Sequence, residues 1–465
     1  MNELFSNFAA MKAKNILIYI VGVLIIPSYL SSCGEDRWAA YAEQTRTTRW
    51  IDDSMRVWYY WADEIPHTDK LNYFTAPEKF FGSLLSKKDK YSHIDSLTNP
   101  ITTRSIPYTD YSYGFQFSTE SVEGNDTALY ARILYVANAS PASDIKLQRG
   151  EWIMKINGEP ITQKNSDKLY GSTTMKLTIG HYDAEKKAIV AYGEPRQIAA
   201  ARSIDDNPVH YHNVYIRDNK RIGYLVYNHF SPGATNNTHE YDNDLRNVFR
   251  NFANQQVNEF ILDLRYNNGG LLSCAELMCS MLAPSSALGK DLGYLEFNSR
   301  TNPKEVSFKL NADLIGEGAN LNLKTLYVLT GSQTASASEM VINCLQPYME
   351  VVLIGSTTVG KNVGSLTFSS QELKITMSPI VCQIYNSKGE SDYASGFTPE
   401  FSVDETDAPK QFLPFGNTEE RMLSTALGVI DGSIKPDDKK QSSALKVITI
   451  TNSIDRRASQ AVRIR

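Results

Sequence analysis

The sequence predicts an α/β protein, because apolar segments typical of buried strands alternate with helical segments over the second half of the chain. The helical segments carry apolar residues on one face, three and four residues apart. Alternation of this kind is typical of a parallel or mixed sheet covered by helices. Strands are expected at 221–227, 259–265, 325–329 and 351–355, and helices at 245–252 and 336–345.

The rest of the chain divides into regions of different character. Residues 50–90 show a helical pattern, whereas 108–197 show short alternating segments with regularly spaced turn residues, which predicts a β-rich module. The expected organisation is an export signal at 1–33, an N-terminal helical region at 34–104, a β-rich domain at 105–200, an α/β domain at 201–432 and a C-terminal tail at 433–465.

The composition indicates a globular protein without a nucleic-acid partner. Of the 465 residues, 42% are apolar and 11% are aromatic, which is enough for sizeable cores. The 47 basic and 52 acidic side chains leave a net charge of −5, and no basic block occurs before the last dozen residues.

Neither the histidines nor the cysteines predict a metal site. The seven histidines include no HExxH motif, and Cys274, Cys279, Cys344 and Cys382 lack CxxC spacing. We expect these four cysteines to be small buried apolar residues. The sequence therefore disfavours a metal site.

The N-terminus resembles a bacterial lipoprotein signal. An apolar run at 16–30 follows a short basic segment, and its 15 residues fall short of the ~20 that a membrane-spanning helix needs. The run ends at Leu30-Ser31-Ser32-Cys33, which resembles the lipobox, whose cysteine is acylated and becomes the mature N-terminus. This resemblance implies a membrane-anchored lipoprotein of the bacterial cell envelope, facing the periplasm or the outside. A short membrane helix with an incidental cysteine is the alternative.

Ser336 and Lys361 are the candidate catalytic residues of the α/β domain. Ser336 follows the strand at 325–329, and Lys361 follows the strand at 351–355. A right-handed strand–helix–strand unit places both at the carboxyl edge of one sheet, where α/β proteins place their chemistry. A helix start offers unpaired N–H groups to an oxyanion, and a lysine whose pKa is lowered by burial can act as a general base.

A structural interpretation of the same residues is also open. Ser336 and Glu339 match a capping box, which would make the serine a helix cap and Lys361 a solvated loop residue. The turn at 267–270 follows another expected strand and contains two glycines. These glycines permit positive φ and close approach of the backbone to a bound group, or they merely turn the chain.

The α/β domain contains three motifs, Asp263-Leu264-Arg265-Tyr266-Asn267-Asn268-Gly269-Gly270, Thr334-Ala335-Ser336-Ala337-Ser338-Glu339 and Gly355-Ser356-Thr357-Thr358-Val359-Gly360-Lys361. In order and spacing they resemble those of the carboxyl-terminal processing peptidases, the tail-specific serine proteases of bacteria and plastids. The resemblance covers residues 50–432. It implies a crotonase-like α/β protease core, serine-type peptidase activity on protein or peptide substrates, and no cofactor.

Carried over by position, the resemblance assigns a Ser-Lys dyad. Ser336 would be the nucleophile and Lys361, 25 residues later, the general base. The oxyanion donors would be the backbone N–H groups of Ala337 and Gly269, with Gly269 preferred to Gly270.

The β-rich domain contains Tyr113-Gly114-Phe115-Gln116-Phe117 and the segments 136–143 and 150–158. The first resembles the carboxylate-binding loop of PDZ domains and the strand after it, and the other two resemble the interior of the same domains. Such domains add a peptide as an extra strand, and the loop of Tyr113, Gly114 and Phe115 would hold its terminal carboxylate. The resemblance therefore implies that substrates are captured by their C-terminal ends. The alternative is a β module whose edge is covered by its neighbours.

Two rival functions remain. A P-loop nucleotidase would use the segment from Gly355 to Lys361, but Asn362 replaces the Ser/Thr that holds Mg²⁺, and 363–368 looks extended where a helix must start. The other rival is a non-catalytic peptide-binding lipoprotein of the same fold. Many family members carry a glutamine four residues after the lysine, where this chain has Ser365. Turnover of a peptide separates this rival from an enzyme.

The membrane anchor can be tested by substitution. Cys33→Ala should release the protein from membranes, because the run at 16–30 is too short to hold it as a helix. Fractionation of cells, followed by mapping of the N-terminus, measures this. A variant that stays uncleaved in the membrane fraction would show that the run is a helical anchor.

Overall fold

The computed structural model describes residues 41–96, 111–122, 129–234, 238–435, 447–456 and 462–463. These residues form two compact units, one within 41–53 and 66–83 and the other within 54–65 and 84–463. The expected export signal, with Cys33, lies outside the described residues. Within the described ranges, no helix combines the length and the apolar character needed to cross a bilayer.

The smaller unit is helical, as the pattern at 50–90 predicts. It contains the first part of α2 (Arg46–Trp58), the 3₁₀ helix η3 (Thr68–Lys70) and most of α3 (Pro77–Leu84). The Tyr73 hydroxyl donates to the Asp52 carboxylate at 2.6 Å, and the Tyr73 ring packs against Phe80 with ring centroids 5.0 Å apart. Tyr73 therefore joins α2 to α3.

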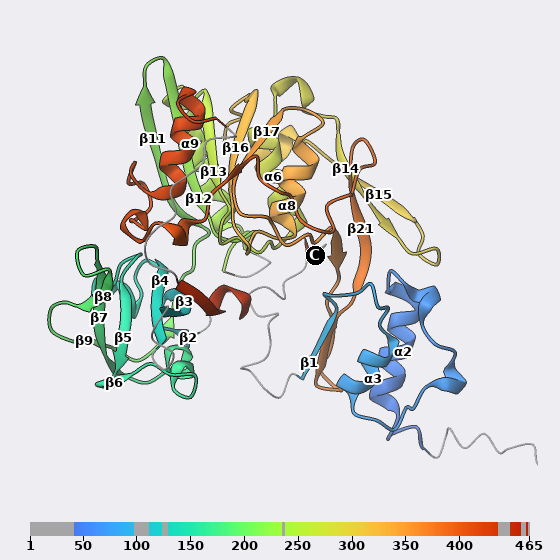
Figure 1. Cartoon of the computed structure of the whole chain (residues 1–465). Helices are drawn as coiled ribbons and strands as arrows, with labels where there is room; N and C mark the ends of the chain where they lie inside the picture. Colours follow the sequence, from blue (N-terminus) through green and yellow to red (C-terminus); the bar gives the residue numbers. More distant parts are fainter. Residues whose placement is uncertain are drawn as a thin grey trace, which may run out of the picture. The chain divides into compact units, whose positions relative to one another are not determined.

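A mixed six-stranded sheet forms the core of the larger unit (Figure 1). β12 to β22 run parallel, and β11 pairs antiparallel at one edge. The predicted α/β class and all four expected strands are confirmed. In spatial order the strands are β11 (Val209–Arg217), β12 (Lys220–Tyr227), β13 (Glu259–Asp263), β16 (Thr325–Thr330), β17 (Glu350–Gly355) and β22 (Phe401–Ser402).

Helices cover both faces of this sheet. Side chains alternate along β12, so Leu225 and Tyr227 join the core on one face, whereas Tyr224 and Val226 join the core on the other. The first face is covered by α5 (Glu240–Asn254), α6 (Leu272–Leu282) and α8 (Ala337–Leu345), and the second by α9 (Arg421–Asp431). The four cysteines expected to be buried are buried and free: Cys274, Cys279, Cys344 and Cys382.

Smaller sheets extend from this core. A five-stranded sheet has the order β15 (Glu305–Lys309), β14 (Asp291–Phe297), β21 (Ile380–Asn386), β18 (Val363–Ser365) and β24 (Val462–Arg463). A three-stranded sheet has the order β1 (His93–Ser96), β20 (Ile375–Ser378) and β19 (Phe368–Ser370), and β10 (Arg202–Ser203) pairs with β2 (Tyr111–Ser112). Because β18 and β19 are strands where a P-loop requires a helix, the nucleotidase interpretation fails.

The β-rich module is an eight-stranded sheet with its own core, as predicted. Its main path is β23 (Val447–Asn452), β3 (Phe115–Val122), β4 (Leu129–Val136), β5 (Trp152–Ile156), β7 (Met175–Asp183) and β8 (Ala188–Ala191), with β6 (Glu159–Pro160) on β5 and β9 (Arg196–Ile198) on β7. A short helix, α4 (Pro141–Asp144), follows β4. The outer edge of β3 is paired with β23, which comes from the C-terminal tail, so in this structure that edge is covered.

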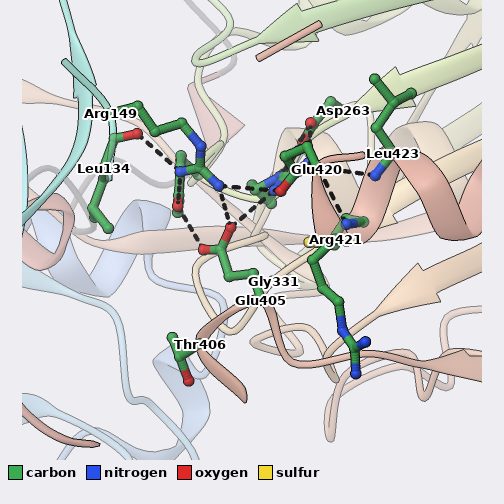
Figure 2. A network of polar contacts seen from close by, with 12 residues as sticks. Leu134, Arg149, Asp263, Gly331, Glu405, Thr406, Glu420, Arg421 and Leu423 are labelled. Carbon is green, nitrogen blue, oxygen red and sulfur yellow. Dashed lines mark hydrogen bonds and ion pairs between the residues drawn. The ribbon is translucent and has the colours of Figure 1, made fainter. Parts of the chain in front are cut away.

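Two buried arginines join the β-rich module to the α/β core (Figure 2). Arg265 contacts Asp263 at 2.7 Å, Glu405 at 2.8 Å and Glu420 at 2.7 Å. Arg149, from the module, contacts the same Glu405 at 2.7 Å and Glu420 at 3.3 Å. Removing one partner of a buried ion pair leaves an uncompensated charge, which typically costs about 3–5 kcal/mol. The network therefore opposes separation of the two domains.

The network predicts a specific acid sensitivity. Burial by itself would raise the pKa of Glu405, but Arg149 and Arg265 lower it from 4.5 to about 2. A carboxylate whose pKa is lower in the folded state contributes stability above about pH 4.5, and this contribution is lost as the pH falls toward 2. Glu405→Gln should therefore flatten the dependence of unfolding free energy on pH in that window.

Urea unfolding of both proteins between pH 2.5 and 6 measures the effect. The control is Glu317→Gln, because Glu317 pairs with Arg250 but its side chain is 93% exposed. Equal pH slopes for the wild type and Glu405→Gln would contradict the assignment.

Candidate active site

Ser336 lies in a strained backbone conformation at the start of α8. It is the N-cap residue, with φ 64° and ψ −114°, although it is not a glycine. Side chains other than glycine rarely adopt such a φ, and the strain costs on the order of 1–3 kcal/mol. Its Oγ is buried and has no hydrogen-bond partner among the described residues. The structure thus holds a buried serine hydroxyl group that makes no side-chain cap hydrogen bond.

The carboxylate of Glu339 connects the two candidate catalytic residues. It is fully buried in the first turn of α8. One oxygen accepts from the backbone N–H of Ser336 at 2.8 Å and of Lys361 at 2.7 Å. The other accepts from the N–H of Gly360 and the hydroxyl of Thr358, both at 2.6 Å. The capping-box position is therefore part of a larger network that fixes the loop after β17 against the start of α8.

Two opposing effects act on the charge of Glu339. Burial raises the pKa of this carboxyl group, and the hydrogen bonds from Thr358, Lys361, Ser336 and Gly360 oppose that shift. Donors aimed at both oxygens stabilise the ionised form. Burial is the larger effect, so the pKa of the carboxyl group that holds the loop around Lys361 is raised overall.

The Asn-Asn-Gly-Gly turn after β13 is fixed to the segment before α8. The Asn267 carbonyl oxygen accepts from the N–H of Ala335 at 3.1 Å and from the hydroxyl of Ser338 at 2.9 Å. The Asn267 side-chain amide donates to the Tyr227 carbonyl at 2.8 Å, which also holds the turn to β12. The turn, α8 and the sheet edge therefore form one rigid assembly.

Gly269 lies directly against the nucleophile segment. Its φ is 105°, and a Cβ there would stand 2.7 Å from the Ser336 Cβ and 3.0 Å from the Ala337 nitrogen. The Gly269 N–H donates to the Asn267 side-chain oxygen at 2.9 Å, so this amide is already engaged. Among the described residues, neither the Gly270 N–H nor the Ala337 N–H has an acceptor.

Lys361 is buried in the loop after β17, with 2% of its surface exposed. Its Nζ stands 4.8 Å from the centroid of the Tyr91 ring. The Tyr91 hydroxyl donates to the Gly360 carbonyl at 3.3 Å. Burial, together with the charges of Glu339 and Asp89, raises the pKa of Tyr91 to about 12, so its hydroxyl is neutral. No local motif identified Tyr91, because it lies 270 residues before Lys361 in the chain.

The predicted site residues fall into two groups. Gly269, Ser336 and Ala337 meet at one point, and Glu339 ties Lys361 to it through the backbone. In the β-rich module, Gly114 has φ 80°, and its N–H donates to the Ser112 hydroxyl at 3.0 Å.

The rings flanking Gly114 pack inward. Tyr113 and Phe115 are 3% and 5% exposed, with centroids 6.1 Å apart. The two rings therefore pack within the module, and the Gly114 N–H between them is engaged by Ser112.

The Glu339 network predicts that exchanging this carboxylate for an amide strongly destabilises the protein. Glu339→Gln replaces one acceptor oxygen by an amide, so two of the four buried donors lose their partner, at about 1–3 kcal/mol each. The free energy of unfolding in urea should fall by the sum of these two losses, about 2–6 kcal/mol. The matched control is Glu276→Gln on α6, whose carboxylate accepts one backbone N–H, from Lys309 at 3.1 Å. Equal losses of stability for the two variants would show that the hydrogen bonds of Glu339 stabilise the protein no more than the single one of Glu276.

Comparison with known proteins agrees with this geometry. The model of peptidase family S41 matches residues 221–403, and that of the peptidase S41 N-terminal domain matches 46–93. The crystal structure of an S41 protease from Bacteroides fragilis is 41% identical in sequence. The likeness covers 83% of this chain and 98% of that chain, with a TM-score of 0.77.

Curated relatives are more distant. A probable CtpA-like serine protease of Staphylococcus haemolyticus is 23% identical over 234 residues, which is 49% of this chain and 41% of the relative. The carboxyl-terminal-processing protease of Synechocystis sp. is 25% identical over 232 residues, 48% of each chain. The matched region thus spans less than half the length of these relatives.

The fold is therefore the crotonase-like α/β core, with a β-rich domain and an N-terminal helical region, that the sequence predicts. The family models and the solved structure agree with the three sequence motifs. The chain belongs to peptidase family S41.

Proposed function

We propose that the protein is a serine endopeptidase that uses Ser336 and Lys361 as a catalytic dyad. The observation that carries this proposal is the buried Glu339 carboxylate, which accepts from the backbone of both residues. A carboxylate that served only as a helix cap would have no reason to hold a loop 22 residues away. The buried Ser336 hydroxyl, which has no hydrogen-bond partner in the described part of the chain, also supports the proposal.

In this mechanism, the neutral amine of Lys361 takes the proton from the Ser336 hydroxyl as Oγ attacks a peptide carbonyl. The tetrahedral intermediate then expels the amine of the departing peptide, which takes a proton from the Lys361 ammonium. An acyl-enzyme remains. Water, activated by the same lysine, hydrolyses the acyl-enzyme and restores both groups. No metal or cofactor takes part.

The burial of Lys361 supports its role as a base, because a low-dielectric environment disfavours the ammonium form. The face of the Tyr91 ring has the opposite tendency, since aromatic faces attract cations. We propose that the ring holds the amine in place and stabilises the ammonium when the proton is transferred.

The oxyanion of the intermediate would be held by the N–H of Ala337, at the positive end of α8. The second donor predicted from the sequence is Gly269. Its amide is engaged by Asn267, whereas that of Gly270 has no acceptor among the described residues. We therefore propose Gly270 N–H as the second donor, with Gly269 as the residue whose missing side chain lets the turn approach Ser336.

The β-rich module would supply substrate capture. We propose that the loop of Tyr113, Gly114 and Phe115 holds the carboxylate of a protein's C-terminus, and that the chain pairs with the edge of β3. A lipid anchor at Cys33 would place this activity at a membrane of the bacterial cell envelope. Protein or peptide substrates with accessible C-termini are then the expected partners.

The dyad is tested by substitution. Lys361→Ala, Lys361→Arg and Ser336→Ala should each lower peptide cleavage by on the order of 10³-fold or more, because arginine is never neutral enough to accept the proton. The double variant should be hardly worse than either single variant, since the two residues act as one unit. The wild-type rate should rise with pH through one ionisation, without a histidine-like midpoint near ~6.5.

Lys374→Arg is the matched control, because Lys374 is exposed in the turn between β19 and β20. Near wild-type cleavage by Lys361→Arg would rule out the dyad. Ser365→Gln should leave activity unchanged or raise it, if the glutamine found in many family members only holds the lysine in place. An absence of turnover in the wild type would favour the non-catalytic peptide-binding alternative.

Substrate capture is tested with peptides of one sequence, either free or amidated at the C-terminus. The free form should bind about tenfold to a hundredfold more tightly, because a charge-assisted hydrogen bond contributes about 1.5–3 kcal/mol. Calorimetry on the Ser336→Ala protein measures both affinities without cleavage. Equal affinities would show that the loop does not recognise a carboxylate.

A further inference from the structure

The C-terminal tail occupies the edge of the β-rich module in the manner of a peptide ligand. β23 pairs antiparallel with β3, with Val447 opposite Val122 and Asn452 opposite Ser118. The tail therefore runs toward the start of β3, where the loop of Tyr113, Gly114 and Phe115 lies. A peptide that pairs with this edge and places its carboxylate in that loop must run in the same direction.

β23 is held by its backbone more than by its side chains. The side chains from Ile448 to Thr451 are all exposed, with Ile448 at 58% and Ile450 at 41%. In β4, by contrast, six of the eight residues are buried. Main-chain pairing with little side-chain burial is typical of an added strand and atypical of a core strand.

The tail is anchored by the two residues that follow β23 in the chain, Ser453 and Ile454. The Ser453 hydroxyl oxygen accepts from the Phe117 N–H at 2.8 Å and donates to the Gln116 side chain at 2.6 Å. Ile454 is fully buried, in a cluster with Leu134, Tyr135, Tyr266 and Phe412.

The same tail reaches the candidate active site. The Asn268 side-chain amide, in the Asn-Asn-Gly-Gly turn, donates to the Ile454 carbonyl at 3.3 Å. Tail residues 449–452 and 455 line a cavity of ≈ 400 Å³. Residues 330–333, which lead to Ser336, line it as well. β24 then pairs with β18, placing Val462 opposite Gly364, three residues after Lys361.

We propose that residues 447–456 form an internal pseudo-substrate, which occupies the peptide-binding edge of β3 and must leave before a substrate chain can pair there. This inference rests on the proposed function for the identity of the competing ligand, a protein C-terminus. In the resting enzyme, the tail fills the peptide-binding edge of β3. A substrate whose C-terminus binds more tightly than the tail displaces it and opens the path along the Asn-Asn-Gly-Gly turn.

A binding experiment tests the inference without needing catalysis. The probe is a fluorescent peptide with the sequence of residues 446–456, Lys-Val-Ile-Thr-Ile-Thr-Asn-Ser-Ile-Asp-Arg. In the Ser336→Ala background, a chain ending at Lys435 should bind this probe at least tenfold more tightly than the full chain, whose own tail fills the edge. A probe with Ile454→Asp should bind the truncated chain at least tenfold more weakly than the native probe.

A reversible disulfide tests the inference even if the truncated chain does not fold. Ile448 and Ser121 are register partners, so Ile448→Cys with Ser121→Cys should form a disulfide that fixes the tail on β3. The cysteines of the described residues are buried, and each single variant serves as a control. Oxidation should lower probe binding and, in the Ser336 form, peptide cleavage by tenfold or more, and reduction should restore both.

The outcomes separate this inference from the proposed function. Probe binding could rise on removal of the tail and fall on its fixation by the disulfide, in a protein that cleaves no peptide. That result would support the inference and reject the peptidase. Cleavage and probe binding that are unchanged by truncation or by oxidation would overturn the inference and leave the peptidase standing. In that case β23 is a permanent strand of the module.

Discussion

The site depends on one buried carboxylate. Glu339 accepts four hydrogen bonds, and their donors come from the start of α8 and from the loop after β17. It thereby holds the backbone N–H groups of both the strained Ser336 and the buried Lys361. The sheet supplies the frame, because the parallel β16 and β17 end at the same edge. The carboxylate then converts this approximate placement into a defined geometry.

Local patterns in the sequence were sufficient to predict four strands of the central sheet, the helices α5 and α8, and the residues that meet at the sheet edge. The spacing of apolar residues predicts the strands and helices, and Gly269 and Gly270 mark the turn that approaches the site. The same patterns could not show that Glu339 reaches Gly360 and Lys361, because Ser-x-x-Glu also describes an ordinary helix cap. Tyr91 and the strained φ of Ser336 were missed for a related reason. Both depend on contacts between segments that are distant in the chain.

The junction between the β-rich module and the core has two layers. Arg149 and Arg265 share Glu405 and Glu420 in a buried network, whereas the tail adds a strand whose own side chains are exposed. The first layer is costly to break, because any lost partner leaves a buried charge. The second consists of main-chain pairing between β23 and β3. The structure therefore combines a domain contact made by buried charges with one made by main-chain hydrogen bonds.

Reaction with a fluorophosphonate tests the central claim most directly, because only an activated serine forms the phosphonyl adduct at a useful rate. Mass spectrometry of the digested protein then maps the modified residue. The account predicts one adduct, at Ser336, and none at Ser338, whose hydroxyl is buried and donates to the Asn267 carbonyl. An adduct at another serine, or no adduct in a protein shown to be folded, would contradict the assignment of Ser336 as an activated nucleophile.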